Sequence, residues 1–213
     1  MPYPAGHRDE VKRQIVASAR RLFNRDGFGS VSVDRIMSGA GLTRGGFYSY
    51  FGSKSELYTE VLGCFFTDPE WKSCWEGVEV DLRSREVGPQ VVRAYLSRQH
   101  FEDVENSCPM VALPCDVTRG GAATRRAFET VFTAMVGVLE RSLPKGAPAA
   151  RRNPAGARRR RASVAQAMAA LCVGGMVVAR ALENRAMADE LRDSCMAVAF
   201  EMAGWRDRKK PRR

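Results

Sequence analysis

The chain has 213 residues, 45% of them hydrophobic and 27% charged, as is typical of a globular protein large enough to bury a core without disulfides. Its formal net charge is +10, but the segments Arg151–Arg161 (+6) and Arg206–Arg213 (+5) account for the whole excess, so charge alone is poor evidence for a nucleic-acid site. No stretch approaches the apolar length that spans a bilayer, and the N-terminus lacks the apolar segment of a signal peptide. We therefore expect a cytoplasmic protein with no membrane partner.

The first predicted element is a helix over residues 8–26, preceded by a disordered arm of residues 1–7. Gly27 is expected to end this helix, because glycine is a common stop signal. Apolar side chains recur along it at helical spacing, on Val11, Ile15, Ala19, Leu22 and Phe23.

Two short helices joined by a glycine turn are predicted between Val33 and Phe51. The first has one apolar face and ends at Gly41, because glycine takes the left-handed conformation without steric cost. Thr43 is placed to cap the second helix with its hydroxyl, and Phe47 and Phe51, four residues apart, point inward. This arrangement is the helix-turn-helix pattern.

The outward residues of this second helix suit DNA. The major groove admits one helix, and the first turn of that helix reads the edges of the bases. Arg44 lies on this turn and can address guanine, whereas Lys54 begins the next helix, where the N-terminal dipole also favours a phosphate. The predicted DNA-contacting residues are Ser32, Val33, Thr43, Arg44, Gly45, Gly46, Tyr48, Tyr50 and Lys54.

Helices are also predicted for the rest of the chain. Ser53 should cap a helix from residue 54 to about 66, with Glu56 at the third position of a capping box. Further helices are expected over residues 89–104, 124–143 with Thr124 as its cap, 162–185 and 188–205, before an unstructured basic tail. Two prolines forbid a long helix across residues 108–116. With no strand-like alternation, the expected fold is all-α.

The chain shows no signature of an enzyme or of a metal site. It has two histidines and lacks the G-x-S-x-G, H-E-x-x-H and phosphate-binding loop motifs, so no catalytic residue and no cofactor are predicted. Six cysteines, at 64, 74, 108, 115, 172 and 195, form no C-x-x-C pair and are expected to be reduced and mostly packed in the core.

The run from Arg8 to Leu62 resembles the N-terminal domain of TetR-type (TetR/AcrR) transcriptional repressors. Tyr50 stands where that family often has His and keeps a hydrogen-bond donor. The family pattern is matched at Leu22, Phe23, Gly27, Phe28, Ile36, Ala40, Gly41, Thr43, Tyr48, Tyr50, Phe51, Ser53, Lys54 and Leu57.

The resemblance implies a helix-turn-helix domain over residues 8–55 and a larger helical effector-binding and dimerisation domain over residues 56–205. It further implies a repressor that binds a palindromic operator as a homodimer and is released by a small molecule. The lining candidates for that effector, mostly apolar, are Trp75, Tyr95, His100, Phe101, Met110, Cys115, Phe128, Met135, Met168 and Cys172.

The last two predicted helices are the candidates for the dimer interface. The resemblance suggests this role, and the sequence supports it independently, because small residues allow the close approach of helices and the last helix has an apolar stripe. The predicted interface consists of Met168, Leu171, Gly174, Gly175, Val178, Leu191, Cys195, Val198 and Met202.

Other interpretations stay open. The large domain could dimerise and respond to a protein partner or to cysteine oxidation in place of a small molecule. Alternatively, the arginine-rich segments could make the chain an RNA-binding or architectural DNA-binding protein, which would be nearly blind to sequence and strongly salt-dependent.

Overall fold

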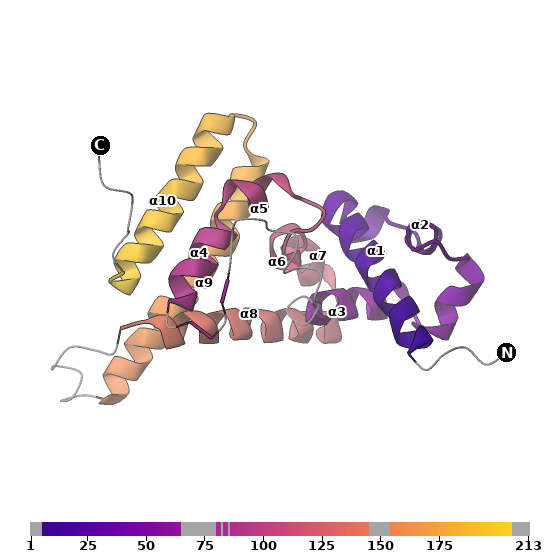
Figure 1. Ribbon diagram of the computed structural model, residues 1–213, viewed down its shortest axis with the longest axis horizontal. Coiled ribbons are helices and arrows are strands. Elements are labelled where there is room, and N and C mark those ends of the chain that lie inside the picture. Colours follow the sequence, from indigo (N-terminus) through magenta and orange to yellow (C-terminus); the bar gives the residue numbers. More distant parts are fainter. Residues whose placement is uncertain (1–5, 65–79, 82, 85, 145–153, 206–213) are drawn as a thin grey trace. The chain divides into compact units, whose positions relative to one another are not determined.

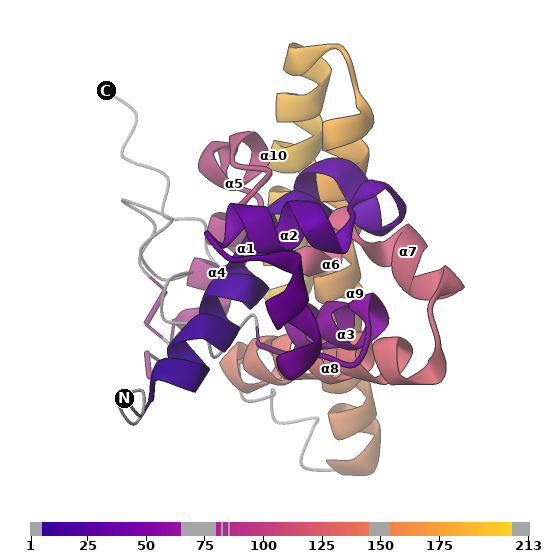
Figure 2. The same cartoon turned by 90° about the vertical axis from the view of Figure 1, so that its right-hand side faces the viewer.

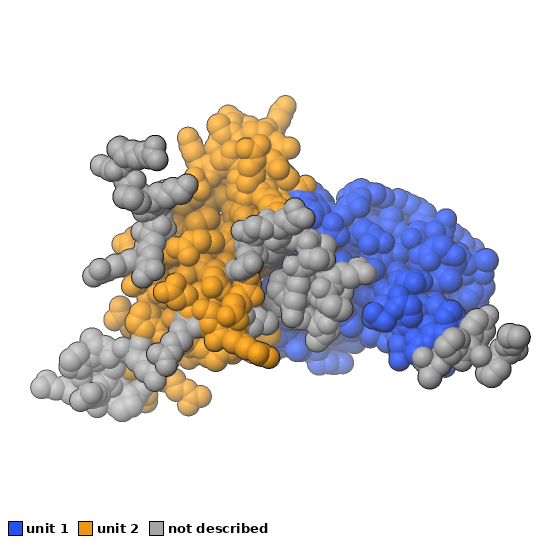
Figure 3. All heavy atoms as spheres, in the orientation of Figure 1, with its two compact units in different colours: residues 1–74, 103–131 blue, residues 75–102, 132–213 orange. Residues whose placement is uncertain are grey.

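The computed structural model describes residues 6–64, 80–81, 83–84, 86–144 and 154–205 (Figure 1). All the regular elements in these ranges are helical, which confirms the predicted all-α fold. The chain divides into two compact units (Figure 3): unit 1 comprises Met1–Cys74 and Asp103–Val131, and unit 2 comprises Trp75–Glu102 and Phe132–Arg213. Unit 1 thus extends beyond residue 55, where the sequence led us to begin the second domain.

Unit 1 begins with the predicted helices and turn. Gly27, at φ 78°, interrupts the first helix where a stop was expected, and His7, assigned to the disordered arm, is already helical. The helices are α1 (His7–Ser30), α2 (Val33–Gly39), the 3-10 helix η1 (Arg44–Ser49) and α3 (Lys54–Cys64).

A second stretch of chain completes unit 1. Each of its two prolines occupies the first turn of a short helix, which is where proline is tolerated best. Thr124 was predicted to cap the next helix, which was wrong: the helix begins at Ala122, and Thr124 Oγ1 lies 3.2 Å from Thr59 Oγ1. The elements are α6 (Pro109–Ala112), α7 (Pro114–Arg119) and residues 122–131 of α8 (Ala122–Ser142).

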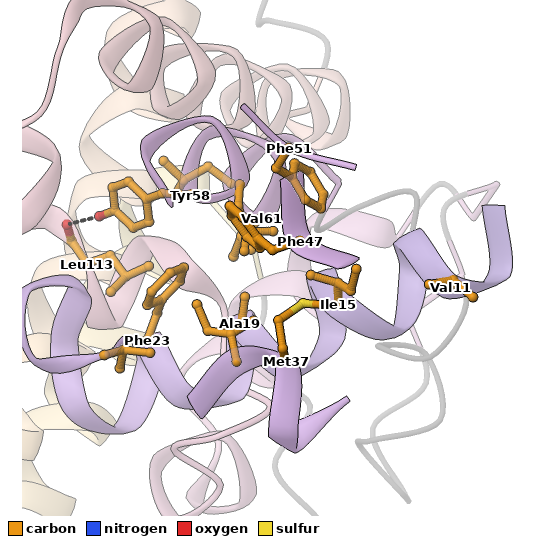
Figure 4. Packing of buried hydrophobic residues seen from close by; sticks show 14 of the residues in the cluster. Val11, Ile15, Ala19, Phe23, Met37, Phe47, Phe51, Tyr58, Val61 and Leu113 are labelled. Carbon is orange, nitrogen blue, oxygen red and sulfur yellow. Dashed lines mark hydrogen bonds between the residues drawn. The ribbon is translucent and has the colours of Figure 1, made fainter. Parts of the chain in front are cut away.

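The core of unit 1 is aromatic (Figure 4). Phe23 and Tyr58 meet edge to face with ring centroids 5.5 Å apart, and the Tyr58 hydroxyl donates to the carbonyl of Leu113 at 3.3 Å. Burial raises the pKa of Tyr58, so this donor stays protonated. Phe47 and Phe51 fill the space below η1 and are fully buried or nearly so. Each such side chain contributes roughly 1.5–3 kcal/mol through its apolar area.

Unit 2 contains a helix break that the sequence analysis did not predict. In place of one helix over residues 89–104, α4 (Val87–Tyr95) ends and α5 (Arg98–Glu102) begins after Ser97, whose Oγ accepts from the N–H of His100 at 3.1 Å. A residue of α10 stabilises this break, because Arg192 Nη1 donates a hydrogen bond to the carbonyl of Leu96 at 2.8 Å. The sequence analysis predicted neither the Ser97 contact nor the Arg192 contact.

The last two helices are α9 (Pro154–Ala181) and α10 (Arg185–Ala203), which pack along each other (Figures 1 and 2). α9 begins eight residues earlier than predicted, so the four consecutive arginines Arg158–Arg161 are helical. Within it Arg161 donates to the carbonyls of Glu140, Leu143 and Pro144 at the end of α8. Asn184 caps α10 by accepting from the N–H of Met187 at 3.2 Å.

The segment Ala155–Ala181 of α9 is long and apolar enough to cross a membrane by length and composition alone. The expectation that no stretch approaches that length was therefore wrong. Core helices of globular proteins pass the same test, and the face of α9 that carries Ala165, Ala169 and Cys172 is fully buried within unit 2.

Candidate nucleic-acid interface

The turn between α2 and η1 has the conformation that the sequence predicts. Ser32 caps α2, since its Oγ accepts from the N–H of Arg35 at 3.2 Å. Gly41 takes φ 71° after the end of α2, and the N–H of Leu42 then returns to the carbonyl of Met37 at 2.8 Å. These bonds fix the direction in which the chain enters η1.

The predicted recognition helix is a 3-10 helix. The N–H of Gly46 bonds to the carbonyl of Thr43 at 3.1 Å, and the two glycines at 45 and 46 lower the propensity for an α-helix. Thr43 occupies the cap position, but its hydroxyl makes no capping bond, so that part of the prediction was wrong. η1 is anchored from below by Phe47, which has no exposed surface.

The predicted DNA-contacting residues are not all equally exposed. The exposed ones include Thr43, Arg44, Gly45 and Tyr48, and the exposed fraction of Tyr48 is 64%. Tyr50 was expected to face outward, but its side chain is half-buried against the core of unit 1. The exposed first turn of η1 is therefore the part of the motif best placed to meet a base.

Arg8 supports the end of η1, a role that the sequence analysis missed. Its Nη2 donates to the carbonyl of Ser49 at 3.0 Å, and its guanidinium lies 5.9 Å from the centre of the Tyr50 ring. An open hollow of about 670 Å³ lies between the start of α1 and the turn. Its lining comprises Gly6, His7, Arg8, Val11, Met37, Leu42, Thr43, Gly46, Ser49 and Tyr50.

The ammonium group of Lys54 is held by the protein backbone. Its Nζ donates to the carbonyls of Phe28 and Val31, both at 2.8 Å, and lies 4.3 Å from the centre of the Phe28 ring. Burial lowers the pKa of Lys54, and nearby Asp116 opposes that shift. Lys54 therefore fixes the segment before α2, and its predicted phosphate contact stays a prediction.

Asp116 of α7 holds the same segment from a distant part of the sequence. Its Oδ2 accepts from the N–H of Phe28 at 2.9 Å. Lys54 and Asp116 thus bind the carbonyl and the N–H of one residue, and together they set where α2 begins. The sequence analysis gave Asp116 no role, because its partner Phe28 lies far away in the sequence.

Ion pairs connect α1, α2 and the segment before α6. Arg25 contacts both Asp26 and Glu105, at 3.1 and 2.6 Å, and Asp26 also binds Arg35 of α2 at 2.6 Å. Hydrogen bonds from Arg25 and then Arg35 keep the pKa of Asp26 below its usual value. Beside them, Asn24 Nδ2 donates to the carbonyls of Glu105 and Ser107. Residues 103–131 are thereby an integral part of unit 1.

The chain was compared with known families and proteins. The sequence model described as "Bacterial regulatory proteins, tetR family" matches residues 15–61, which span the helix-turn-helix segment. The HTH-type transcriptional regulator AcrR of Shigella flexneri is 40% identical over 52 residues, and EthR of Mycolicibacterium smegmatis is 33% identical over 87 residues. The helix-turn-helix segment of this chain is therefore similar in sequence to that of TetR-family regulators.

These matches cover 24% and 41% of this chain, and they span only 24% and 37% of the length of the two relatives. Solved structures extend the likeness of fold to nearly the whole chain. E. coli NemR in its reduced form has a TM-score of 0.64 at 17% identity, covering 90% of this chain and 96% of NemR. A TetR-family regulator from Cytophaga hutchinsonii has the same TM-score at 16% identity, with 97% and 100% covered.

The predicted effector-lining residues are divided between the two units. Met110, Cys115 and Phe128 lie in unit 1, where Cys115 is exposed on α7, and Trp75 lies outside the described residues. The others lie in unit 2 and are buried: Tyr95, His100, Phe101, Met135, Met168 and Cys172. Among them the rings of Tyr95 and His100 meet edge to face at 4.9 Å, and His100 Nδ1 lies 2.6 Å from the Tyr95 carbonyl oxygen.

The predicted dimer residues face in two directions. Three of them are buried inside unit 2, where they face neighbouring helices of the same chain: Met168 and Gly175 of α9, and Cys195 of α10. Leu171 and Leu191 are half-buried. The members that are exposed are Gly174, Val178, Val198 and Met202.

Proposed function

We propose that this protein is a sequence-specific DNA-binding transcriptional regulator of the bacterial cytoplasm, acting as a repressor. The observation that carries this proposal is the exposed first turn of η1. There Thr43, Arg44 and Gly45 are presented above the buried anchors Phe47 and Phe51. A rigid core beneath a short polar turn suits the major groove, where base edges are read by the first turn of a helix.

The regulator acts as a homodimer on a palindromic operator. The proposal is supported by exposed apolar side chains on both α9 and α10: Val177, Val178, Met187, Val198 and Met202. A Cβ added at Gly174 would meet nothing within 4 Å, so this part of α9 has room for a closely approaching helix. A two-fold axis would let this one patch contact its own copy.

Release from DNA by a small, largely apolar or aromatic effector is the finer part of the proposal. Its support is the composition of the candidate lining in unit 2, where Met135, Met168 and Cys172 accompany the polar His100. Binding need be coupled to DNA release by only a few kcal/mol, since about 1.4 kcal/mol changes an affinity tenfold.

Cysteine oxidation is the alternative control mechanism, and the cysteines of this chain differ in how readily they could be oxidised. Burial raises the pKa of Cys172 to about 12 and also raises that of Cys195, which makes both thiols poor nucleophiles at neutral pH. The exposed cysteine among the described residues is Cys115. Oxidant-dependent loss of DNA binding that Cys115→Ser abolishes would favour this mechanism over a small molecule.

The test is selection of DNA from a random pool by the purified protein, followed by affinity measurements on the recovered site. We expect an inverted repeat whose half-sites lie about one helical turn, roughly 34–36 Å, apart. Arg44→Ala should relax the preference at one base pair in each half-site by about 1–3 kcal/mol. Recovery of no preferred sequence, with affinity set by salt alone, would contradict the proposal and favour an architectural role for the arginine-rich segments.

A further inference from the structure

Arg44, the proposed base-reading residue, forms an ion pair with an aspartate of the preceding helix. Its Nη1 donates to Asp34 Oδ2 at 3.1 Å. Asp34 lies in the first turn of α2 and Arg44 begins η1, so the pair joins the starts of the two helices of the motif. Both side chains are exposed, at 66% and 55%, and an ion pair so exposed adds little to the stability of a fold.

The geometry of this pair leaves one edge of the guanidinium able to donate to a base. A guanidinium carries five N–H groups in a rigid planar fork. Within the described part of the chain, the hydrogen bond seen for the Arg44 side chain is the one from Nη1 to Asp34. The edge formed by Nε and Nη2 can therefore make two parallel bonds, and guanine offers the matching pair of acceptors, O6 and N7, in the major groove.

We propose that Asp34 is a specificity-determining residue that orients Arg44 for the recognition of guanine. The inference rests on the proposed function and adds a second residue to the readout. The long side chain of Arg44 loses rotamer freedom when it binds a base. Because Asp34 already restricts that side chain in the free protein, less entropy is lost on binding DNA. Its carboxylate also repels phosphate, which lowers the affinity for all DNA sequences alike.

A simpler role for Asp34 is to stabilise α2 alone, since an acidic side chain in the first turn interacts favourably with the helix dipole. The two roles predict different results. A residue that only stabilises α2 changes the affinity for every DNA sequence by one common factor, whereas an orienting residue changes the preference at the base pair that Arg44 reads.

The experiment uses the full chain and the site selected by the wild type, with that site altered one base pair at a time. Affinities at one salt concentration are compared for the wild type, Asp34→Ala, Arg44→Ala and the double variant. Asp34→Ala should reduce discrimination at the base pair read by Arg44 by about three- to tenfold, a fraction of what a bidentate contact supplies. In the Arg44→Ala background the same change should cause no further loss.

Two further variants keep the result interpretable. Asp34→Asn retains an acceptor oxygen and should keep part of the preference while binding all DNA more tightly. Asp9→Ala removes an exposed carboxylate from the first turn of α1 and should leave the preference unchanged. An unchanged preference in Asp34→Ala would overturn the inference, whereas a wild type that selects no site would overturn the proposed function itself.

Discussion

Each of the two units of this chain is stabilised internally by a different kind of packing. In unit 1, large aromatic rings fill the core: Phe23, Phe28 and Tyr58 form one group, and Phe47 and Phe51 another. In unit 2, α9 and α10 approach through small side chains, among them Ala165, Ala169, Cys172, Ala188 and Ala199, which are all fully buried. Unit 1 should therefore be most sensitive to the loss of volume, and unit 2 to its addition.

The polar contacts within the two units also differ. In unit 1, Lys54 and Asp116 bind the backbone of a single residue near the end of α1, Phe28, and so position the start of α2. In unit 2, arginines bind the carbonyls at helix ends: Arg161 binds the end of α8, and Arg192 binds the end of α4. The first arrangement fixes a surface that we propose to be functional, whereas the second fixes where helices end.

The largest expected effect tests the aromatic core. Phe47→Ala should destabilise unit 1 by about 3–5 kcal/mol, because it leaves a cavity beneath η1 where Phe47 has no exposed surface. The neighbouring Tyr48 is 64% exposed, so Tyr48→Ala should stay within about 0.5 kcal/mol of the wild type. Urea unfolding of both variants measures the difference. Equal losses would mean that the ring of Phe47 does not anchor η1.

The next effect tests the small-residue packing of unit 2 with two adjacent glycines of α9. A Cβ at Gly175 would lie 2.7 Å from Cys195 Sγ, so Gly175→Ala should cost about 1–3 kcal/mol through overpacking. A Cβ at Gly174 meets nothing within 4 Å, so Gly174→Ala should stabilise the helix by up to about 1 kcal/mol. Thermal melts of the two variants should shift in opposite directions, and a shared direction would contradict this view of the α9–α10 contact.

Much of unit 1 could be predicted because its signals are local. The end of α2 is marked by Gly41 and the start of α3 by Ser53 and Glu56, all within a few residues of the helix ends concerned. Ser53 Oγ accepts from the N–H of Glu56, and the carboxylate of Glu56 accepts from the N–H of Gly52. The break between α4 and α5 was missed because Arg192, which binds Leu96, is far away in the sequence. The inward direction of Cys195 was missed for a related reason, since an apolar stripe does not reveal which neighbour covers it.

A smaller effect tests the contact from α7 to the segment before α2. Asp116→Ala removes the acceptor for the N–H of Phe28 and should cost about 1 kcal/mol, because the hydrogen bond is charged but its carboxylate is partly exposed. Asp116→Asn keeps an acceptor oxygen and should recover much of that loss. If this contact with Phe28 matters for DNA binding, Asp116→Ala should also lower the affinity for the selected site. A loss of stability with no change in affinity would limit Asp116 to the fold.

The smallest expected effect is a pH dependence that originates at Asp26. Hydrogen bonds from Arg25 and then Arg35 hold the pKa of this partly buried carboxyl below its ordinary value of 3.8. The unfolded chain therefore binds a proton at a higher pH than the folded chain does, and acid favours unfolding. The stabilising contribution is present above about pH 4 and is lost as the pH falls through the lowered pKa.

Asp26→Asn removes this contribution and provides the measurement. Urea unfolding at pH 7 should show the variant slightly less stable than the wild type, and the difference should narrow at pH 3, where the unfolded wild-type chain already binds a proton at this carboxyl. Arg25→Gln removes the partner with the largest influence on Asp26 and should shrink the pH-dependent difference without abolishing it, since Arg35 still binds Asp26 at 2.6 Å. A difference between wild type and Asp26→Asn that is the same at both pH values would mean that the Asp26 ion pairs do not persist in solution, and that α1 and α2 are held together by their apolar contacts and by the buried hydrogen bond from Ser18 Oγ to the carbonyl of Ile36.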